Sequence, residues 1–121
     1  MANKFEFKQE NRANLDICGK KYVVEMTAEN IAASDEITAQ FSAVGKEAQK
    51  LEGAESVIHM CTFCADSIDR LLGSGSTKEI FGDRAITLPD LIDLLLYIQN
   101  EIREVFEKAQ ARDGKAAKIK K

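Results

Sequence analysis

Residues 87–106 have the sequence TLPDLIDLLLYIQNEIREVF, which carries the clearest structural signal in the chain. Thr87 is placed to cap a helix, and Pro89 and Asp90 suit the first helical turn. The apolar residues recur at spacings of three and four, which puts them on one side of a helix turning about 100° per residue. They are Leu88, Leu91, Ile92, Leu95, Ile98, Ile102, Val105 and Phe106. We predict a helix over about residues 88–108 with this side buried.

Three large side chains lie off the apolar sides of their predicted helices. Leu96 and Tyr97 project roughly 120° and 140° from the centre of the apolar side of the last helix. Phe63 projects roughly 140° from the apolar side of an earlier helix. Such residues either fill a second internal layer or form an association surface. Phe63, Leu96 and Tyr97 are therefore the candidate interaction surface.

The composition indicates one soluble domain over residues 1–110. The 121 residues are 45% hydrophobic and 31% charged, and a chain of this length buries a sizeable core. A net charge of -3 argues against nucleic acid as the main partner, because neutralising phosphates requires a basic face. Only the C-terminal end is strongly basic, and we predict that residues 111–121 form a flexible basic tail.

No stretch of the sequence predicts a membrane or secreted protein. The longest apolar run, residues 94–98, is far shorter than the roughly 20 residues that span a bilayer. The N-terminus MANKFEFK lacks the apolar stretch of a secretory signal. A cytoplasmic protein without a membrane partner is therefore expected. The three cysteines, an odd number, suit reduced thiols in that compartment better than a disulfide framework.

The N-terminal part of the chain predicts a small antiparallel β-structure over residues 4–26. Charged residues alternate with phenylalanines from Lys4 to Lys8, which indicates a half-buried strand. NRAN at residues 11–14 has the composition of a turn, and apolar alternation on both sides of Gly19 predicts a β-hairpin. The unit is a hairpin or a three-stranded meander. Because a lone hairpin is marginally stable in water, it must pack on helices or pair with another copy.

Helical spacing replaces this alternation after Thr27, which is placed to cap a short turn. Ser34 and Asp35 offer a second start, for a helix over about residues 35–52, and another helix follows over about 55–72. Their apolar rows have heptad spacing and consist of Ile37, Phe41, Val44, Ala48 and Leu51, and of Val57, Cys61, Cys64, Ile68 and Leu71. An antiparallel helix pair is the simplest arrangement, and one long helix kinked at Gly53 is the alternative that stays open.

A glycine-rich connection and a short helix complete the predicted order of elements. GSGS at residues 73–76 predicts a flexible connection. STKE at residues 76–79 has the capping-box pattern and predicts a short helix over about 77–82. We therefore expect a mainly α protein with a small N-terminal antiparallel β-hairpin or meander, an α+β fold organised as a helical bundle.

Two cysteines imitate a chemical motif. Cys61 and Cys64 have the CxxC spacing of redox and zinc sites, but they fall within a helix and on its apolar side. We expect them to be buried thiols that pack as small hydrophobic side chains. A zinc site would need two further ligands. Cys18 lies in the hairpin, and His59, the only histidine, points roughly 160° away from Cys61 and is expected to be solvated.

No other pattern indicates catalysis. GSGSTK at residues 73–78 lacks the adjacent glycine and lysine and the preceding strand of a phosphate-binding loop. Glu101, Glu104 and Glu107 lie on the outer side of the last helix, where solvated carboxylates are the ordinary case. We therefore expect a non-enzymatic protein with no catalytic residues, no cofactor and no metal.

A family resemblance is carried by residues 80–102, IFGDRAITLPDLIDLLLYIQNEI, which follow LLGSGS and a hairpin with the pattern FEFK...GKKYVVEM. This pattern resembles the small tail assembly chaperones of phages and prophages of Gram-positive bacteria, which are encoded just before the tape measure protein. The resemblance implies a protein of the host cytoplasm that binds the tape measure protein during tail morphogenesis, keeps it soluble and recruits tail tube subunits. It supplies no catalytic residues.

Three functional hypotheses follow. The first is a tail assembly chaperone that self-associates, because its helices carry more apolar surface than one seam needs. The second is another small cytosolic interaction or structural phage protein with the same fold and a different client. The third, less favoured, is a metal or thiol module built on Cys18, Cys61 and Cys64.

Overall fold

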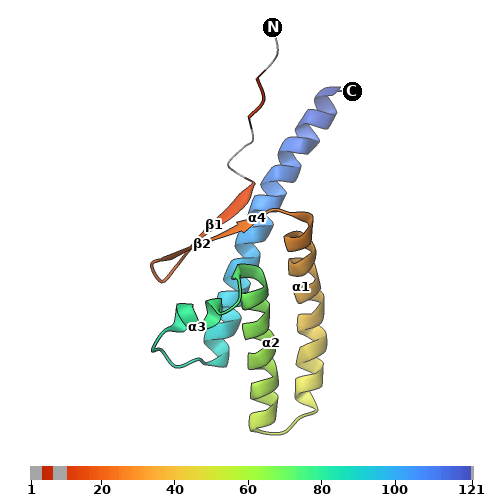
Figure 1. Cartoon of the computed structure of the whole chain (residues 1–121). Coiled ribbons are helices and arrows are strands. Elements are labelled where there is room, and N and C mark those ends of the chain that lie inside the picture. The colour runs from red at the N-terminus through yellow and green to blue at the C-terminus, as the bar shows by residue number, and fades with distance from the viewer. Residues whose placement is uncertain (1–3, 7–10, 121) are drawn as a thin grey trace.

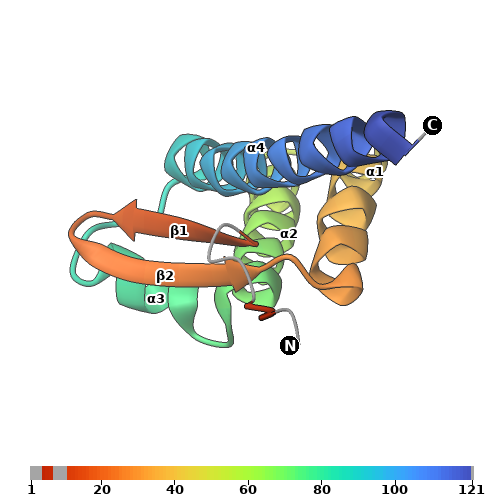
Figure 2. The ribbon, with the colours of Figure 1, turned by 90° about the horizontal axis from the view of Figure 1, so that it is seen from above.

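The computed structural model describes residues 4–6 and 11–120 of the chain, and side chains as far as residue 110. Its elements are, in order, β1 (Arg12–Ile17), β2 (Lys20–Glu25), α1 (Ala28–Gln49), α2 (Ala54–Leu72), α3 (Ser76–Phe81) and α4 (Leu88–Lys120). Helices α1 and α2 run antiparallel side by side, α4 lies along α2, and the β-hairpin packs against α4 and α2 (Figures 1 and 2). The predicted mainly α fold with an N-terminal antiparallel hairpin is confirmed.

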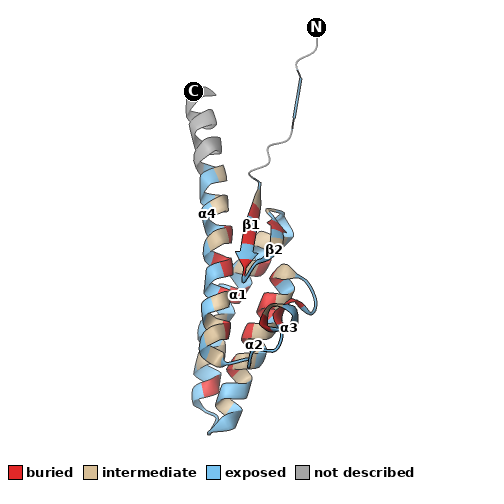
Figure 3. Ribbon diagram, turned by 90° about the vertical axis from the view of Figure 1, so that its left-hand side faces the viewer, coloured by how far each residue is buried: buried red, intermediate tan, exposed pale blue. Residues whose placement is uncertain are grey.

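The core lies between α4, α2 and the inner face of the hairpin (Figure 3). The predicted apolar side of α4 is buried, since Leu91, Leu95 and Ile98 are each 0% exposed. Thr87 caps this helix as expected, because its hydroxyl accepts a hydrogen bond from the backbone N–H of Asp90 at 3.4 Å. The other buried apolar side chains include Leu15, Val24, Ala33, Ile37, Cys64, Ile68 and Ile102.

The predicted β-hairpin around Gly19 is present, and its two-residue loop is formed by Cys18 and Gly19. Cys18 and Gly19 have φ angles of 54° and 84°, the positive values that a type I′ turn requires at both central residues. The carboxylate of Asp16 accepts a hydrogen bond from the backbone N–H of Gly19 at 3.1 Å and binds the ammonium of Lys21 at 2.7 Å. These contacts hold the register in which Leu15 pairs with Tyr22.

The predictions for the chain before the hairpin are wrong where the structure describes it. Residues 4–6 belong to no strand, and Phe5 is 76% exposed rather than half-buried; Phe7 and Lys8 lie outside the described residues. NRAN is not a turn, because β1 already begins at Arg12. The backbone N–H of Met26 donates to the carbonyl of Asn11 at 3.0 Å, which extends the pairing by one bond. The described sheet therefore has two strands rather than three.

The first helix is longer than predicted. Thr27 caps it by accepting a hydrogen bond from the N–H of Asn30 at 3.0 Å, and the helix continues without a second start at Ser34 and Asp35. Ser34 lies inside the helix, where its backbone carbonyl accepts hydrogen bonds from the side chains of Thr38 and Gln99. The chain then turns back at Gly53 (φ 57°), so the antiparallel pair is correct and the single kinked helix is not.

Helix α2 buries most of its predicted heptad row, because Cys64, Ile68 and Leu71 are buried and Cys61 is partly buried, but its N-terminal end differs. Val57 is 49% exposed, and Met60 is buried instead. The buried set is Met60, Cys64, Ser67, Ile68 and Leu71. The reason is that α2 packs against both α1 and α4, so its buried side lies between two neighbours rather than along one seam.

Helix α3 begins without the predicted capping box. Gly75 is its N-cap, and the carboxylate of Asp69 in α2 accepts hydrogen bonds from the backbone N–H groups of Thr77 at 2.8 Å and Gly75 at 3.3 Å. Glu79, expected to complete the box, instead accepts a hydrogen bond from the hydroxyl of Tyr22. A side chain from another helix therefore caps the start of α3 through the N–H groups of Gly75 and Thr77. The N–H groups of Ser76 and Glu79, which the box would have used, donate to the backbone carbonyls of Gly73 and Gly75.

Helix α4 continues past the end predicted near residue 108. Its backbone is helical to Lys120, so residues 111–120 extend the helix instead of forming a separate tail. Among these residues only Gly114 is a poor helix former, and the alanines and lysines around it favour helix.

Leu95→Asp is expected to unfold the domain, whereas the adjacent Leu96→Asp leaves it folded. Leu95 is 0% exposed and Leu96 is 47% exposed. An unpaired carboxylate at Leu95 costs more than about 4 kcal/mol, which is comparable with the whole stability of a small domain. Far-UV circular dichroism and urea unfolding measure both effects. A Leu95→Asp protein as stable as the parent would contradict the buried side assigned to α4.

Candidate interaction surface

Leu96 and Tyr97 lie on the outer side of α4, as their helical phase predicts. They are 47% and 36% exposed, whereas their neighbours Leu95 and Ile98 are fully buried. Because Leu95 and Ile98 are anchored in the core, the helix cannot rotate, and Leu96 and Tyr97 stay on its outer side. A rigid helix presents them, so they need little reordering before they contact a partner.

Phe63 does not join this surface. Its ring packs edge-to-face on Phe41 of α1, with centroids 6.0 Å apart and an interplanar angle of 70°, so it belongs to the internal layer between α1 and α2. Sequence reasoning left this alternative open but could not select it, because the position of α1 relative to α2 is a tertiary property.

The same helix pair is joined at its surface by two polar contacts. Arg70 of α2 binds Glu36 of α1 at 2.8 Å, and the imidazole Nε2 of His59 lies 3.3 Å from a carboxylate oxygen of Glu47. His59 is thus a surface residue, as expected, and its side chain, which is 37% exposed, also contacts a carboxylate of α1. His59 points towards α1 because α2 turns a second side to that helix.

The three cysteines occupy different environments. Cys64 is buried, Cys61 is partly buried and Cys18 is exposed in the hairpin turn. Burial, together with the neighbouring Cys61 thiol, raises the pKa of Cys64 to about 11, so this thiol stays protonated near neutral pH. Within the described residues, no three His, Cys, Asp or Glu side chains come together to hold a metal ion.

The glycine-rich segment that imitates a phosphate-binding loop already binds an anion from the protein itself. Its N–H groups at Gly75 and Thr77 donate to the carboxylate of Asp69, and the hydroxyl of Thr77 donates to the same carboxylate at 2.8 Å. The donors that would face a phosphate are used to join α3 to α2.

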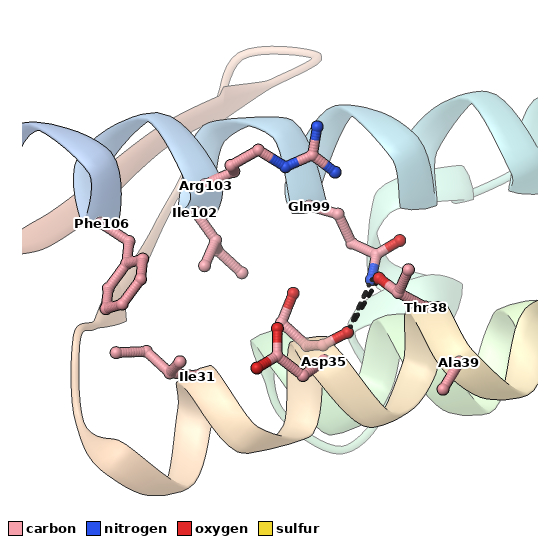
Figure 4. Close-up of a pocket in the computed structure, with 9 residues that line it drawn as sticks. Ile31, Asp35, Thr38, Ala39, Gln99, Ile102, Arg103 and Phe106 are labelled. Carbon is pink, nitrogen blue, oxygen red and sulfur yellow. Dashed lines mark hydrogen bonds between the residues drawn. The ribbon is translucent and has the colours of Figure 1, made fainter.

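A groove between α1 and α4, not predicted from the sequence, hollows the surface of the helical body (Figure 4). It has a volume of about 350 Å³ and is lined by Ile31, Ser34, Asp35, Thr38, Ala39, Gln99, Ile102, Arg103 and Phe106. We call it the α1–α4 groove. Ile31 and Phe106 approach each other at one end, and Ile102 points into the hollow between the two helices. The walls are mainly apolar, with polar atoms at the edges.

Gln99 closes the other end of the α1–α4 groove. It is only 7% exposed, and its amide nitrogen donates to the carbonyl of Ser34 and the hydroxyl of Thr38, both at 3.0 Å. A glutamine next to the apolar side of α4 is the one signal in the sequence that could have pointed to this contact, because buried polar side chains require partners.

A second hollow of about 290 Å³ lies where the hairpin turn meets α3 and the start of α4. Cys18, Phe81 and Leu94 contribute to its walls, and an ion pair between Arg84 and Asp90 at 2.9 Å lies beside them. Arg84 and the hydroxyl of Thr87 lower the pKa of Asp90. These residues join the loop before α4 to its first turn and bring no nucleophile and base together.

Within the described part of the chain, no helix is both long and apolar enough to cross a bilayer. A scan against protein-family models found no match, and searches of curated proteins and of solved structures found none either.

The buried thiol of Cys64 is expected to make the stability fall at alkaline pH. Its pKa is raised to about 11 in the folded chain, so the unfolded chain releases this proton first and is favoured as the pH rises. Between about pH 8 and about pH 10.5 the parent should lose about 1 to 2 kcal/mol more unfolding free energy than Cys64→Ala does. Urea unfolding across this range measures the difference, and parallel pH profiles would contradict the burial of the thiol.

Proposed function

We propose that this protein is a tail assembly chaperone of a phage or prophage, which binds the tape measure protein in the bacterial cytoplasm and recruits tail tube subunits. The observation that carries the proposal is the pair Leu96 and Tyr97, apolar side chains left 47% and 36% exposed on a helix whose other apolar side is buried. An acidic domain that offers apolar contacts and no assembled catalytic group among its described residues suits a binding role better than catalysis.

The segment that carries the resemblance is mainly used to orient α4. Ile80 and Phe81 pack on the core, Arg84 pairs with Asp90, and Thr87 caps the helix. The segment therefore holds the beginning of α4 against the body at a defined angle. Leu96 and Tyr97 follow on the same rigid helix and remain exposed for a client, whereas Ile86, the other large exposed apolar side chain of this segment, lies in the loop before the helix.

The expected client contact is an apolar side of a helix in the tape measure protein. Tyr and Leu side chains gain most when a partner covers them completely, and a rigid support keeps the entropy cost of binding low. The acidic charge of the domain keeps the complex soluble while the long client is covered.

Tyr97→Ala and Leu96→Ala are each expected to weaken client binding roughly tenfold, or about 1.4 kcal/mol, without unfolding the domain. The measurement is co-purification, followed by titration calorimetry, with the product of the long reading frame immediately downstream. Ile58→Ala is the matched control, because Ile58 is an exposed apolar residue of α2 (61%) outside the proposed surface.

The proposal fails if the parent protein neither co-purifies with that product nor increases its soluble yield. Equal weakening by Ile58→Ala would instead indicate general apolar adhesion and not a surface centred on Leu96 and Tyr97.

A further inference from the structure

The α1–α4 groove has unused binding capacity. Asp35 lies on its α1 wall and Arg103 on its α4 wall, and both are exposed. Among the described residues, neither side chain has a hydrogen bond or an ion pair. Ile31 and Phe106, at one end of the groove, are only partly buried. The groove thus combines an apolar floor with one unpaired charge of each sign.

Helix α4 extends past the elements that cover it. It has 33 residues, a length of about 50 Å, and its C-terminal part rises beyond the hairpin and α1 (Figure 1). The fully buried positions of its apolar side end at Ile102, and Val105, Phe106 and Ala109 are only partly buried. We call residues 107–120 the distal segment. It begins at the residue after Phe106, which lines the α1–α4 groove.

The charges of the body and of the C-terminal end are opposite. Residues 111–121 hold five of the 17 Lys and Arg residues and one of the 20 Asp and Glu residues. Their net charge is therefore +4, and that of residues 1–110 is -7. The single acid of this end, Asp113, stands among the lysines, so the end carries a charge of each sign, as the groove does.

We propose that the distal segment of one copy lies in the α1–α4 groove of a second copy, and reciprocally, in a closed two-fold dimer. Two α4 helices that cross antiparallel near Phe106 bring each distal segment over the groove of its partner, because the groove adjoins the point where the segment leaves its own body. The 14-residue segment is about 21 Å long, and the α4 wall of the groove from Gln99 to Phe106 is about 10 Å long. The segment cannot reach its own groove, because it continues α4 as one unbroken helix.

A second copy suits the groove because its distal segment is basic by sequence, whereas the body that carries the groove is acidic and offers the unpaired Asp35. The alanines of the distal segment, Ala116 and Ala117 among them, are small enough for two helices to approach closely. This inference does not depend on the client proposed above, since it concerns the purified chain alone.

The test uses two full-length variants of opposite design, studied by analytical ultracentrifugation at low salt. Asp35→Lys reverses the charge of the groove, and Lys115→Glu/Lys118→Glu reverses that of the distal segment. The parent should be a dimer that dissociates as the salt concentration rises. Each variant alone should raise the dimer dissociation constant at least tenfold, because like charges then meet in both grooves.

Mixing the two variants should restore the dimer to near the parental dissociation constant. In the mixed dimer one groove is acidic and receives a basic segment, while the other groove is basic and receives an acidic segment. Glu52→Lys, at an exposed position between α1 and α2, is the control with the same charge change as Asp35→Lys and should leave the dimer intact. Circular dichroism confirms that every variant is folded.

A monomeric parent overturns the inference, and so does a mixture of the two variants that stays monomeric. A parent that is monomeric alone but binds the tape measure protein through Asp35 and Arg103 would assign the groove to the client; the dimer would then be wrong and the proposed function would stand. Assemblies larger than a dimer would overturn the closed two-fold arrangement.

Discussion

The burial of one side of α4 is the constraint on which the other elements depend. Leu91, Leu95 and Ile98 are completely removed from solvent, and each such side chain contributes about 1.5 to 3 kcal/mol of transfer free energy. The two-stranded sheet and the six-residue α3 are too short to be stable alone. They persist because β1 packs on α4, and because α3 packs on α2, which itself packs on α4.

Hydrogen bonds from buried or partly buried polar side chains fix an arrangement of helices that apolar contacts alone would not specify. Gln99 joins α4 to α1, and Asp69 joins α3 to α2. In the described part of the chain, no buried side-chain nitrogen or oxygen lacks a hydrogen-bond partner. An unpaired group at either position would cost more than the bond contributes, so these contacts favour one packing over its competitors. Gln99 and Asp69 therefore have a structural role, which is to join helices.

The two proposed surfaces share α4 and differ in kind. Leu96 and Tyr97 are exposed apolar side chains on the outer side of α4, whereas the α1–α4 groove is a hollow bordered by opposite charges. Binding at Leu96 and Tyr97 is stabilised mainly by burial of apolar area, whereas binding in the α1–α4 groove gains specificity from complementary charges. Because one continuous helix carries both, a dimer formed through the groove would fix how the two proposed patches of Leu96 and Tyr97 face each other.

The sequence alone determined the elements whose signals are local. The one-sided helix from residue 88, the hairpin around Gly19 and the helical character of the segment before the glycine-rich connection follow from residue periodicity and turn chemistry, which require no knowledge of neighbours in space. The structure decided that this segment is an antiparallel helix pair and not one helix kinked at Gly53. Only the tertiary structure decided that α2 buries Met60 and not Val57, and that Phe63 and His59 contact α1. The reason is that α2 packs against both α1 and α4, and a single heptad row describes contact with one neighbour. The contacts of Gln99 with Ser34 and of Asp69 with Thr77, and the α1–α4 groove itself, join residues from different elements. Such contacts depend on how helices are placed in space, and no local pattern in the chain records that placement.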